Sequence, residues 1–347
     1  MKKSKLLMTM AASLMLFAAC SNADGGTTNA DNNATTPPQT NTDTRETLYF
    51  IPVVDIGAYW APMRIGAEQT AEELGYNLVV KTSPPAQPDK NTMHIGFINE
   101  ATSNRAAGIA VAPIEQNMFR NPIVDAMNAG IPVITFDGDL DNENDRTAYV
   151  GTNNEEAGAE LARNAVRVMK EKGITEGALS IVTVDRAMPT MIHRENGIKR
   201  AFEEEMGADA ANFRWLETIQ DDDQAAVSQQ QLEGQITANA DLVVVFSLGS
   251  EGPDVGTMNA IESQGLAGQI LHFGFDYTPT WEHGIEKGLI TGIVDQDAFQ
   301  IGVSVIENLV KAVNGETIPS VIPIDVRWVP ASELVAYGAQ KQAMMGE

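Results

Sequence analysis

Polar and aromatic side chains follow several of the short apolar runs in this sequence. They stand where the strands of an open α/β sheet would end: Tyr59, Trp60, Asp137, Asp276 and Gln296. Ligands of such sheets bind beyond the carboxyl ends of the strands. Any one of these residues alone would be an ordinary loop residue, but together they predict a ligand site along that edge.

The elements that would position these residues alternate along the chain. Apolar runs predict buried strands at residues 48–54, 76–80, 108–112, 131–136, 178–184, 213–218, 241–247 and 269–275. Helical stretches are predicted at residues 62–74, 94–105, 121–129, 154–172, 191–206, 223–238 and 255–264. Residues 81–92 are polar and proline-rich, which predicts a loop. Continuous apolar strands are typical of sheets with helices on both faces. The predicted fold class is therefore α/β, with two doubly wound Rossmann-like units in series.

The sequence lacks the common motifs of catalysis and nucleotide binding. It has no Walker A loop, no GxGxxG after a strand, no HExxH pair and no GxSxG elbow. The acidic run of residues 137–145 fails the EF-hand pattern, because Asn142 stands at its sixth position and Ala148 at its twelfth. We therefore expect a solvated acidic turn there, no metal, no cofactor and no enzymatic activity.

Charge and length limit the partners and the architecture. The 347 residues carry a net charge of −24 at pH 7. Such a charge disfavours nucleic acid and anionic lipid surfaces as partners. Residues 47–347 are long enough for about two domains.

Residues 1–20 have the pattern of a secretory signal peptide. Lys2, Lys3 and Lys5 precede an apolar run, and small residues then lead to Cys20, the single cysteine of the chain. The apolar run is shorter than the ~20 residues that a membrane-spanning helix needs. The sequence therefore predicts an exported protein.

Residues 16–20 (LFAAC) resemble a bacterial lipobox, with Phe17 where an aliphatic residue is usual. That resemblance implies a lipid anchor on Cys20, which would hold the protein at a bacterial membrane, on the cell surface or in the periplasm. Residues 21–46 lack periodicity and large apolar side chains, which predicts a flexible polar tether.

Five stretches, in order, resemble those of the periplasmic sugar-binding proteins of ABC transporters, of the ribose- and galactose-binding (type I) group. They are residues 72–80 (EELGYNLVV), 129–137 (AGIPVITFD), 149–154 (YVGTNN), 274–276 (GFD) and 300–302 (QIG). The resemblance covers about residues 48–329. It implies the type I periplasmic binding protein fold, in which two lobes joined by a three-strand hinge close on a ligand. The first lobe would hold residues 47–150 plus 297–325, and the second residues 151–296 plus 326–347.

The resemblance also assigns roles to side chains. Tyr59 and Trp60 match an aromatic pair that stacks on a sugar ring. The positions that match groups hydrogen-bonding the sugar are Asp137, Arg194, Asp223, Ser250, Asp276 and Gln296. A carboxylate bonds a hydroxyl more strongly than a neutral acceptor does, so a ligand that lacks this hydroxyl would be rejected.

Some positions depart from the ribose-type pattern. Gly138 stands where an arginine follows the strand-end aspartate, and Gly57 replaces an asparagine before the aromatic pair. The asparagine expected after the strand at residues 241–247 is displaced to Gly249 or Ser250. We therefore expect a ligand other than ribose, larger or differently hydroxylated.

The resemblance implies a monomeric solute-binding lipoprotein that captures a monosaccharide or sugar derivative and delivers it to the permease of an ABC importer. One alternative is a signalling receptor of the same fold that presents an autoinducer-like molecule or a nucleoside to a membrane sensor. Another is an exported enzyme acting on glycosides, which would need two carboxylates at a fixed separation.

Overall fold

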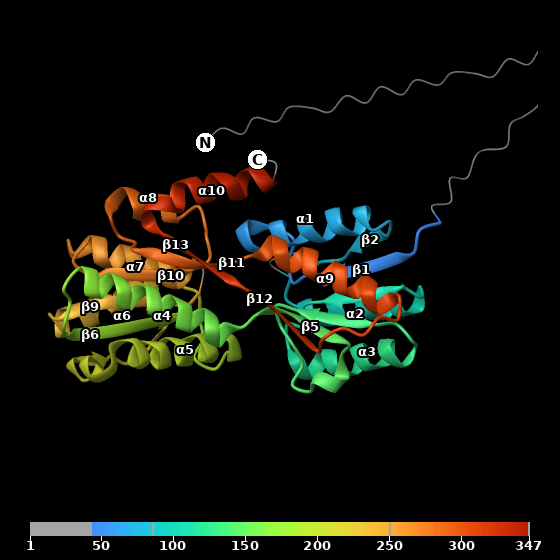
Figure 1. The fold of residues 1–347 in the computed structure, drawn as a ribbon, viewed down its shortest axis with the longest axis horizontal. Coiled ribbons are helices and arrows are strands. Elements are labelled where there is room, and N and C mark those ends of the chain that lie inside the picture. Colours follow the sequence, from blue (N-terminus) through green and yellow to red (C-terminus); the bar gives the residue numbers. More distant parts are fainter. Residues whose placement is uncertain (1–43, 85–86, 250, 346–347) are drawn as a thin grey trace, which may run out of the picture. The chain divides into compact units, whose positions relative to one another are not determined.

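The computed structural model describes residues 44–84, 87–249 and 251–345, which form two α/β lobes (Figure 1). The two-lobed α/β fold predicted from the sequence is confirmed. In these described ranges no helix has the length and apolarity needed to cross a membrane. The predicted signal peptide, Cys20 and most of the predicted tether lie outside the described residues.

The first lobe is built on a six-stranded parallel sheet with the strand order β12-β5-β4-β3-β1-β2. Its strands are β1 (Thr47–Ile51), β2 (Asn77–Val80), β3 (Gly108–Val111), β4 (Val133–Phe136), β5 (Ala148–Thr152) and β12 (Val321–Ile324). Its helices are α1 (Gly57–Glu73), α2 (Lys90–Ser103), α3 (Gln116–Asn128), the short 3-10 helix η1 (Glu143–Asp145) and α9 (Ala298–Val313). Successive strand residues point to opposite faces. Phe50 therefore packs with the side chains of α1 and α9, and Ile51 with those of α2 and α3.

The second lobe is built on a seven-stranded sheet in the order β13-β11-β10-β9-β6-β7, with β8 pairing beside β6. Its strands are β6 (Gly177–Thr183), β7 (Phe213–Trp215), β8 (Ile219–Gln220), β9 (Leu242–Ser247), β10 (Leu271–Phe275), β11 (Gly292–Gln296) and the antiparallel β13 (Val326–Pro330). Its helices are α4 (Asn154–Glu171), α5 (Pro189–Met206), η2 (Gly207–Asn212), α6 (Ala225–Ala238), α7 (Gly252–Ser263), α8 (Trp281–Lys287) and α10 (Ala331–Met345). Buried side chains of α4 and α5 cover one face, and those of α6, α7, α8 and α10 cover the other.

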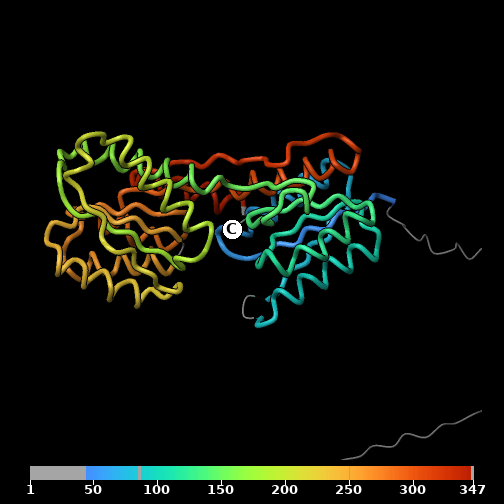
Figure 2. The backbone as a smooth tube through the Cα atoms, turned by 90° about the horizontal axis from the view of Figure 1, so that it is seen from below, coloured from blue at the N-terminus to red at the C-terminus, as the bar shows by residue number. Residues whose placement is uncertain are grey.

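The two sheets are connected at three places within the described residues, at 152–154, 296–298 and 324–326 (Figure 2). The first connection leads from β5 into α4, and the second from β11 into α9. In the third, β12 of the first sheet continues almost directly into β13 of the second. The connections therefore join the lobes where β5 and β11 reach their carboxyl ends.

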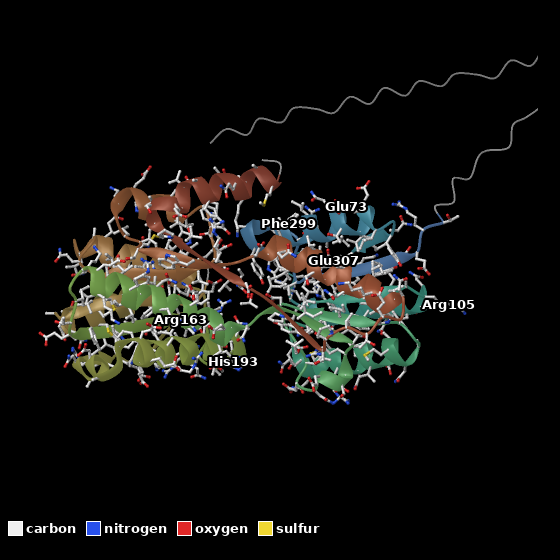
Figure 3. All side chains as sticks on the ribbon, in the orientation of Figure 1. Glu73, Arg105, Arg163, His193, Phe299 and Glu307 are labelled. Carbon is white, nitrogen blue, oxygen red and sulfur yellow. The ribbon has the colours of Figure 1, made fainter. Side chains whose placement is uncertain are left out.

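Close helix packing sets the position of α1, which begins at the connecting edge. A Cβ on Gly302 of α9 would lie 1.9 Å from the carbonyl oxygen of Met63, and one on Gly66 of α1 would lie 2.4 Å from that of Phe299. Both glycines are thus needed for the backbones of α1 and α9 to approach this closely. Phe299, near the start of α9, is labelled beside α1 (Figure 3).

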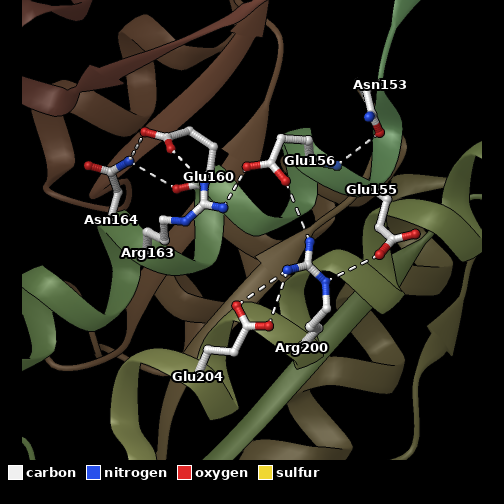
Figure 4. A network of polar contacts seen from close by, with 8 residues as sticks. All are labelled: Asn153, Glu155, Glu156, Glu160, Arg163, Asn164, Arg200 and Glu204. Carbon is white, nitrogen blue, oxygen red and sulfur yellow. Dashed lines mark hydrogen bonds and ion pairs between the residues drawn. The ribbon is translucent and has the colours of Figure 1, made fainter.

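The outer faces of α4 and α5 are joined by a network of ion pairs (Figure 4). Arg200 of α5 bonds Glu155 and Glu156 of α4 as well as Glu204 on its own helix. Arg163 bonds Glu156 from the other side, at 2.5 Å. These groups are half exposed, so the network orients the two helices more than it stabilises the fold.

Several helices begin earlier than the sequence suggested. The helix predicted over residues 62–74 starts at Gly57, and the one predicted over 121–129 starts at Gln116. The first prediction began at Pro62 and the second at Asn121, just before Pro122, whereas the structure places both prolines inside their helices. A proline inside a helix removes one backbone hydrogen bond to the carbonyl four residues earlier.

Two other local predictions were wrong. Residues 81–92 are not entirely loop, because α2 begins at Lys90. The weak strand predicted at 213–218 is divided into β7 and β8, and both pair with β6.

The acidic run at 137–145 is only partly the solvated turn that we expected. Residues 141–144 are exposed. Asp139, however, pairs with the buried Arg146 at 2.5 Å, and Asp145 is buried against Arg120. These carboxylates therefore hold the loop after β4 in place.

Candidate ligand-binding site

A cavity of about 360 Å³ lies at the edge where the lobes are connected. We call it the first cavity. Among the residues that line it are these predicted from the sequence: Tyr59, Trp60, Asp137, Arg194, Asp223, Asp276 and Gln296. Ser250 lies outside the described residues, while its neighbour Gly249 lines the cavity.

The first lobe contributes an aromatic pair and one carboxylate. Tyr59 and Trp60 lie in the first turns of α1, with ring centroids 5.3 Å apart and ring planes at 81°. The Tyr59 hydroxyl donates a 2.6 Å hydrogen bond to Oδ1 of Asp137, which directly follows β4. Asp137 has a φ of 61°, so its backbone is in the left-handed region, which an aspartate tolerates better than most residues.

Burial dominates the electrostatics of this pair. It raises the pKa of Asp137, while the hydrogen bond from Tyr59 and the charge of Arg194 oppose that shift. Burial also raises the pKa of Tyr59, and the neighbouring Asp137 carboxylate adds to the effect. Tyr59 is therefore a neutral donor, and its bond leaves lone pairs of Asp137 available to a ligand.

The second lobe contributes a buried guanidinium. Arg194 of α5 is 5% exposed and donates through Nε to Oδ1 of Asn154 at 2.9 Å. It also donates to the carbonyl oxygen of Leu248 at 3.2 Å, and its guanidinium lies 4.2 Å from the ring centroid of Phe275. Arg194 is thus held by an amide, a carbonyl and an aromatic face before any ligand is bound.

A carboxylate and an amide meet at the ends of β10 and β11. Asp276 accepts hydrogen bonds from Gln296 at both oxygens, from the backbone amide at 3.1 Å and from the side-chain amide at 2.8 Å. Burial raises the pKa of Asp276, and the charge of Arg194 opposes the shift. Asp276 is therefore fixed as an acceptor at this edge of the sheet.

Asp223 lies at the rim, after β8. It is exposed and has a φ of 58°, and its Oδ1 accepts a 3.0 Å hydrogen bond from the amide of Gly252. That bond ties the start of α7 to the loop after β8.

A buried residue beside the site was not found from the sequence. Asp295 precedes Gln296 on β11 and has no exposed side-chain area. Its carboxylate accepts hydrogen bonds of 2.6 Å from the Tyr277 amide and the Tyr337 hydroxyl, and it pairs with Lys341 at 2.6 Å. Tyr337 and Lys341 belong to α10, so the C-terminal helix holds the strand end that carries Gln296.

Further lining residues were also missed: Thr152, Asn154, Val184, Met188, Thr190 and Met191. Thr152 ends β5 and Asn154 follows it, so the strand-end rule would have found them if residues 148–152 had been predicted as a strand. Val184 directly follows β6, at the end of the strand predicted over residues 178–184. Met188, Thr190 and Met191 lie on α5 or just before it, where helical spacing gave no signal. Among the described residues, no group of three or more His, Cys, Asp or Glu side chains could hold a metal ion.

Comparisons with known proteins agree with this architecture. The family model described as "Periplasmic binding protein domain" matches residues 48–317. The ribose import binding protein RbsB of Salmonella typhimurium is 25% identical over 271 residues, which is 78% of this chain and 86% of that protein. The xylose/arabinose-binding protein XylF of Sulfolobus acidocaldarius is 24% identical over 269 residues, 74% of this chain and 63% of that protein.

Solved structures share the fold. A periplasmic solute-binding protein of an ABC transporter from Actinobacillus succinogenes, solved with D-allose, superposes with a TM-score of 0.73 at 23% identity, covering 84% of this chain and 100% of that one. The glucose-galactose binding protein GanP of Geobacillus stearothermophilus superposes with a TM-score of 0.70 at 20% identity, covering 84% of this chain and 99% of that one. Because the family model matches most of the chain, this protein belongs to the periplasmic binding protein family and has its type I fold.

Proposed function

We propose that this protein is an exported solute-binding protein that captures a monosaccharide or sugar derivative in the first cavity and delivers it to an ABC importer. One observation carries the proposal: an aromatic pair from one lobe and hydrogen-bonded charged groups from the other line the same cavity of about 360 Å³. A sugar ring has an apolar C–H face and a rim of hydroxyls. Such a ligand needs both kinds of wall.

Each wall would serve a different part of the sugar. Trp60 and Tyr59 would stack on the apolar face of the ring. Asp137 and Asp276 would accept from hydroxyls, and Arg194 would donate to a ring or hydroxyl oxygen. The names of the relatives support this assignment, because they bind ribose, and xylose or arabinose.

Binding would shift an equilibrium between open and closed arrangements of the lobes. We assign residues 47–150 plus 297–325 to one moving body and 151–296 plus 326–347 to the other, except that Gly151 and Thr152 belong to β5 and therefore move with the first body. The ligand touches both walls fully only when the lobes close, so it favours the closed arrangement. The importer permease would then recognise that arrangement.

We also propose that the mature protein is a monomer held at the membrane by a lipid on Cys20. The sequence pattern of residues 1–20 supports the lipid anchor, and the monomeric state follows from the family resemblance alone. Expression of the full chain and of Cys20→Ser in a bacterial host, followed by detergent phase partitioning, tests the anchor. The native chain is expected in the detergent phase and the variant in the aqueous phase.

A thermal-shift screen of residues 44–347, which form a compact unit, tests the binding function. The panel contains pentoses, hexoses, polyols, nucleosides and autoinducer-like compounds. A ligand that binds only the folded state must raise the melting temperature. We expect a rise with one or more sugars; a rise with only a nucleoside or signalling molecule would favour the receptor alternative.

A further inference from the structure

A second cavity, of about 630 Å³, adjoins the first. The two cavities share the lining residues Asp137, Thr152, Asn154, Met188 and Thr190, so they form one continuous cleft. The second cavity is the larger part, and it extends away from the Asp276–Gln296 pair. His193 lines it too, near the start of α5, at the end of that helix closer to the first lobe (Figure 3).

The walls of the second cavity are mainly apolar. The apolar residues that line it are Val53, Pro113, Ile114, Met188 and Pro189. Ile114 of the first lobe is 39% exposed and Met188 of the second is 40% exposed. A single exposed apolar side chain is ordinary. Ile114 and Met188, however, come from opposite lobes and line one cavity, so together they form an apolar surface that the protein leaves uncovered.

Most polar side chains along this cavity are already engaged in local structure. Asp139 bonds Arg146 and Thr135, and the Tyr149 hydroxyl donates to the carbonyl oxygen of Asp137. Glu115 caps α3, and Asn153 caps α4. The second cavity shares Asp137 and Thr152 with the first but lacks Asp276, and its other carboxylates, Glu115 and Asp139, are already bonded within the protein.

Gly138 lets two loops at the second cavity pack closely against each other. It follows Asp137 and lines the second cavity. A Cβ at this position would lie 2.5 Å from the carbonyl oxygen of Pro113, so any side chain would displace the loop that carries Ile114. Gly138 therefore fixes the loop of Ile114 close to Asp137, so that the apolar wall begins near the carboxylate that would bind the sugar.

We propose that the preferred ligand is a sugar that carries an apolar substituent, such as an alkyl or aryl glycoside. The sugar ring would occupy the first cavity, and the apolar group would lie in the second between Ile114 and Met188. The proposal rests on the proposed sugar-binding function. Burial of each additional methylene in an apolar site raises affinity by about fourfold.

Calorimetric titration of residues 44–347 tests the proposal. The probes are D-ribose, D-xylose, D-glucose, D-galactose and D-allose, each as the free sugar and as its methyl, butyl and phenyl glycosides. We expect at least one sugar for which affinity rises from the methyl to the butyl glycoside, by about tenfold or more in total.

The outcomes separate this proposal from the function on which it rests. If free sugars bind and every glycoside binds equally or more weakly, the second cavity has no ligand role and the sugar-binding function still stands. Lactose and maltose are titrated alongside; if either binds more tightly than every alkyl glycoside, the cavity selects hydroxyls and our assignment is wrong. If no sugar and no glycoside binds, the proposed function itself fails.

A variant links the effect to the second cavity. Ile114→Ser should lower butyl-glycoside affinity by about fivefold, because it removes apolar contact, and leave free-sugar affinity within about twofold. Ile192→Ser is the matched control: Ile192 is 41% exposed on α5 and lines neither cavity. Equal losses for both variants, or a loss of free-sugar affinity in Ile114→Ser, would overturn the assignment.

Discussion

The two walls of the first cavity differ in how far their polar groups are bonded before a ligand arrives. On the second-lobe wall, Arg194 bonds Asn154 and a carbonyl, and Asp276 is held by two hydrogen bonds from Gln296. On the first-lobe wall, the carboxyl of Asp137 receives one side-chain hydrogen bond, from Tyr59. The second wall is thus preorganised, and the first is an aromatic surface with a less restrained carboxylate.

This difference indicates an order of events. A sugar meets a wall whose charged groups are already oriented, so little ordering entropy is lost there. The aromatic wall then closes on the exposed face of the ring. We expect the second lobe to contribute most of the affinity, and the first lobe to contribute mainly through closure.

The largest expected effect is on the second wall. Asp276→Ala should weaken sugar binding by about 1,000-fold, because it removes the acceptor and leaves the amides of Gln296 unpaired. Titration calorimetry with the sugar found in the screen measures the loss. Asp222→Ala, an exposed carboxylate outside the cavity, is the control and should bind normally. Unchanged affinity in Asp276→Ala would show that this wall does not bind the sugar.

The fixed position of the β11 end, which carries Gln296 of the second wall, should also depend on α10. Lys341→Met leaves the fully buried carboxylate of Asp295 without its cation, which should lower the free energy of unfolding by about 3 kcal/mol. Chemical denaturation of residues 44–347 measures this change. Lys311→Met, on the exposed side of α9, should change stability little. Equal stability in both variants would mean that α10 does not hold the β11 end.

The first wall should show a smaller effect. Trp60→Ala should weaken binding by about tenfold through loss of ring stacking, whereas Trp60→Phe should retain most of the affinity. Small-angle scattering with and without sugar reports closure separately from binding. If Trp60→Ala closes normally and binds as tightly as the native chain, the aromatic surface is not part of the site.

The sequence predicted the parts of this site that follow from local pattern. Asp137 and Asp276 could be found because each directly ends an apolar strand, and a strand end fixes where its next residue lies. The alternation of strands and helices likewise predicted both lobes. The positions matched by resemblance, Arg194 among them, needed the family pattern, because a residue on a helix has no comparable landmark.

The features that the sequence did not predict depend on contacts between residues far apart in the chain. Asp295, Tyr337 and Lys341 come together only because β13 pairs antiparallel with β11 and brings α10 back over it. Nothing in the local sequence of Lys341 distinguishes it from an exposed helical lysine. The second cavity also escaped prediction, because its size depends on loops from both lobes.

The last prediction uses pH to compare the carboxylates of the two walls. Burial raises the pKa of both Asp137 and Asp276 above the ordinary value of 3.8. Ligand hydroxyls donate to the ionised carboxylate, so binding favours the deprotonated form. Affinity should therefore be full above the raised pKa values and fall as the pH drops through them, by at most about tenfold per pH unit for each group.

The comparison of the two walls predicts which carboxylate controls the loss of affinity at low pH. Asp276 accepts two hydrogen bonds from Gln296, and Asp137 accepts one from Tyr59, so the ionised form of Asp137 is less stabilised by donors. Titrations between about pH 7 and pH 4 should therefore show a flatter profile in Asp137→Asn than in the native chain. An unchanged slope in Asp137→Asn would place the titrating group on the second wall and contradict the view that this wall is the more preorganised one.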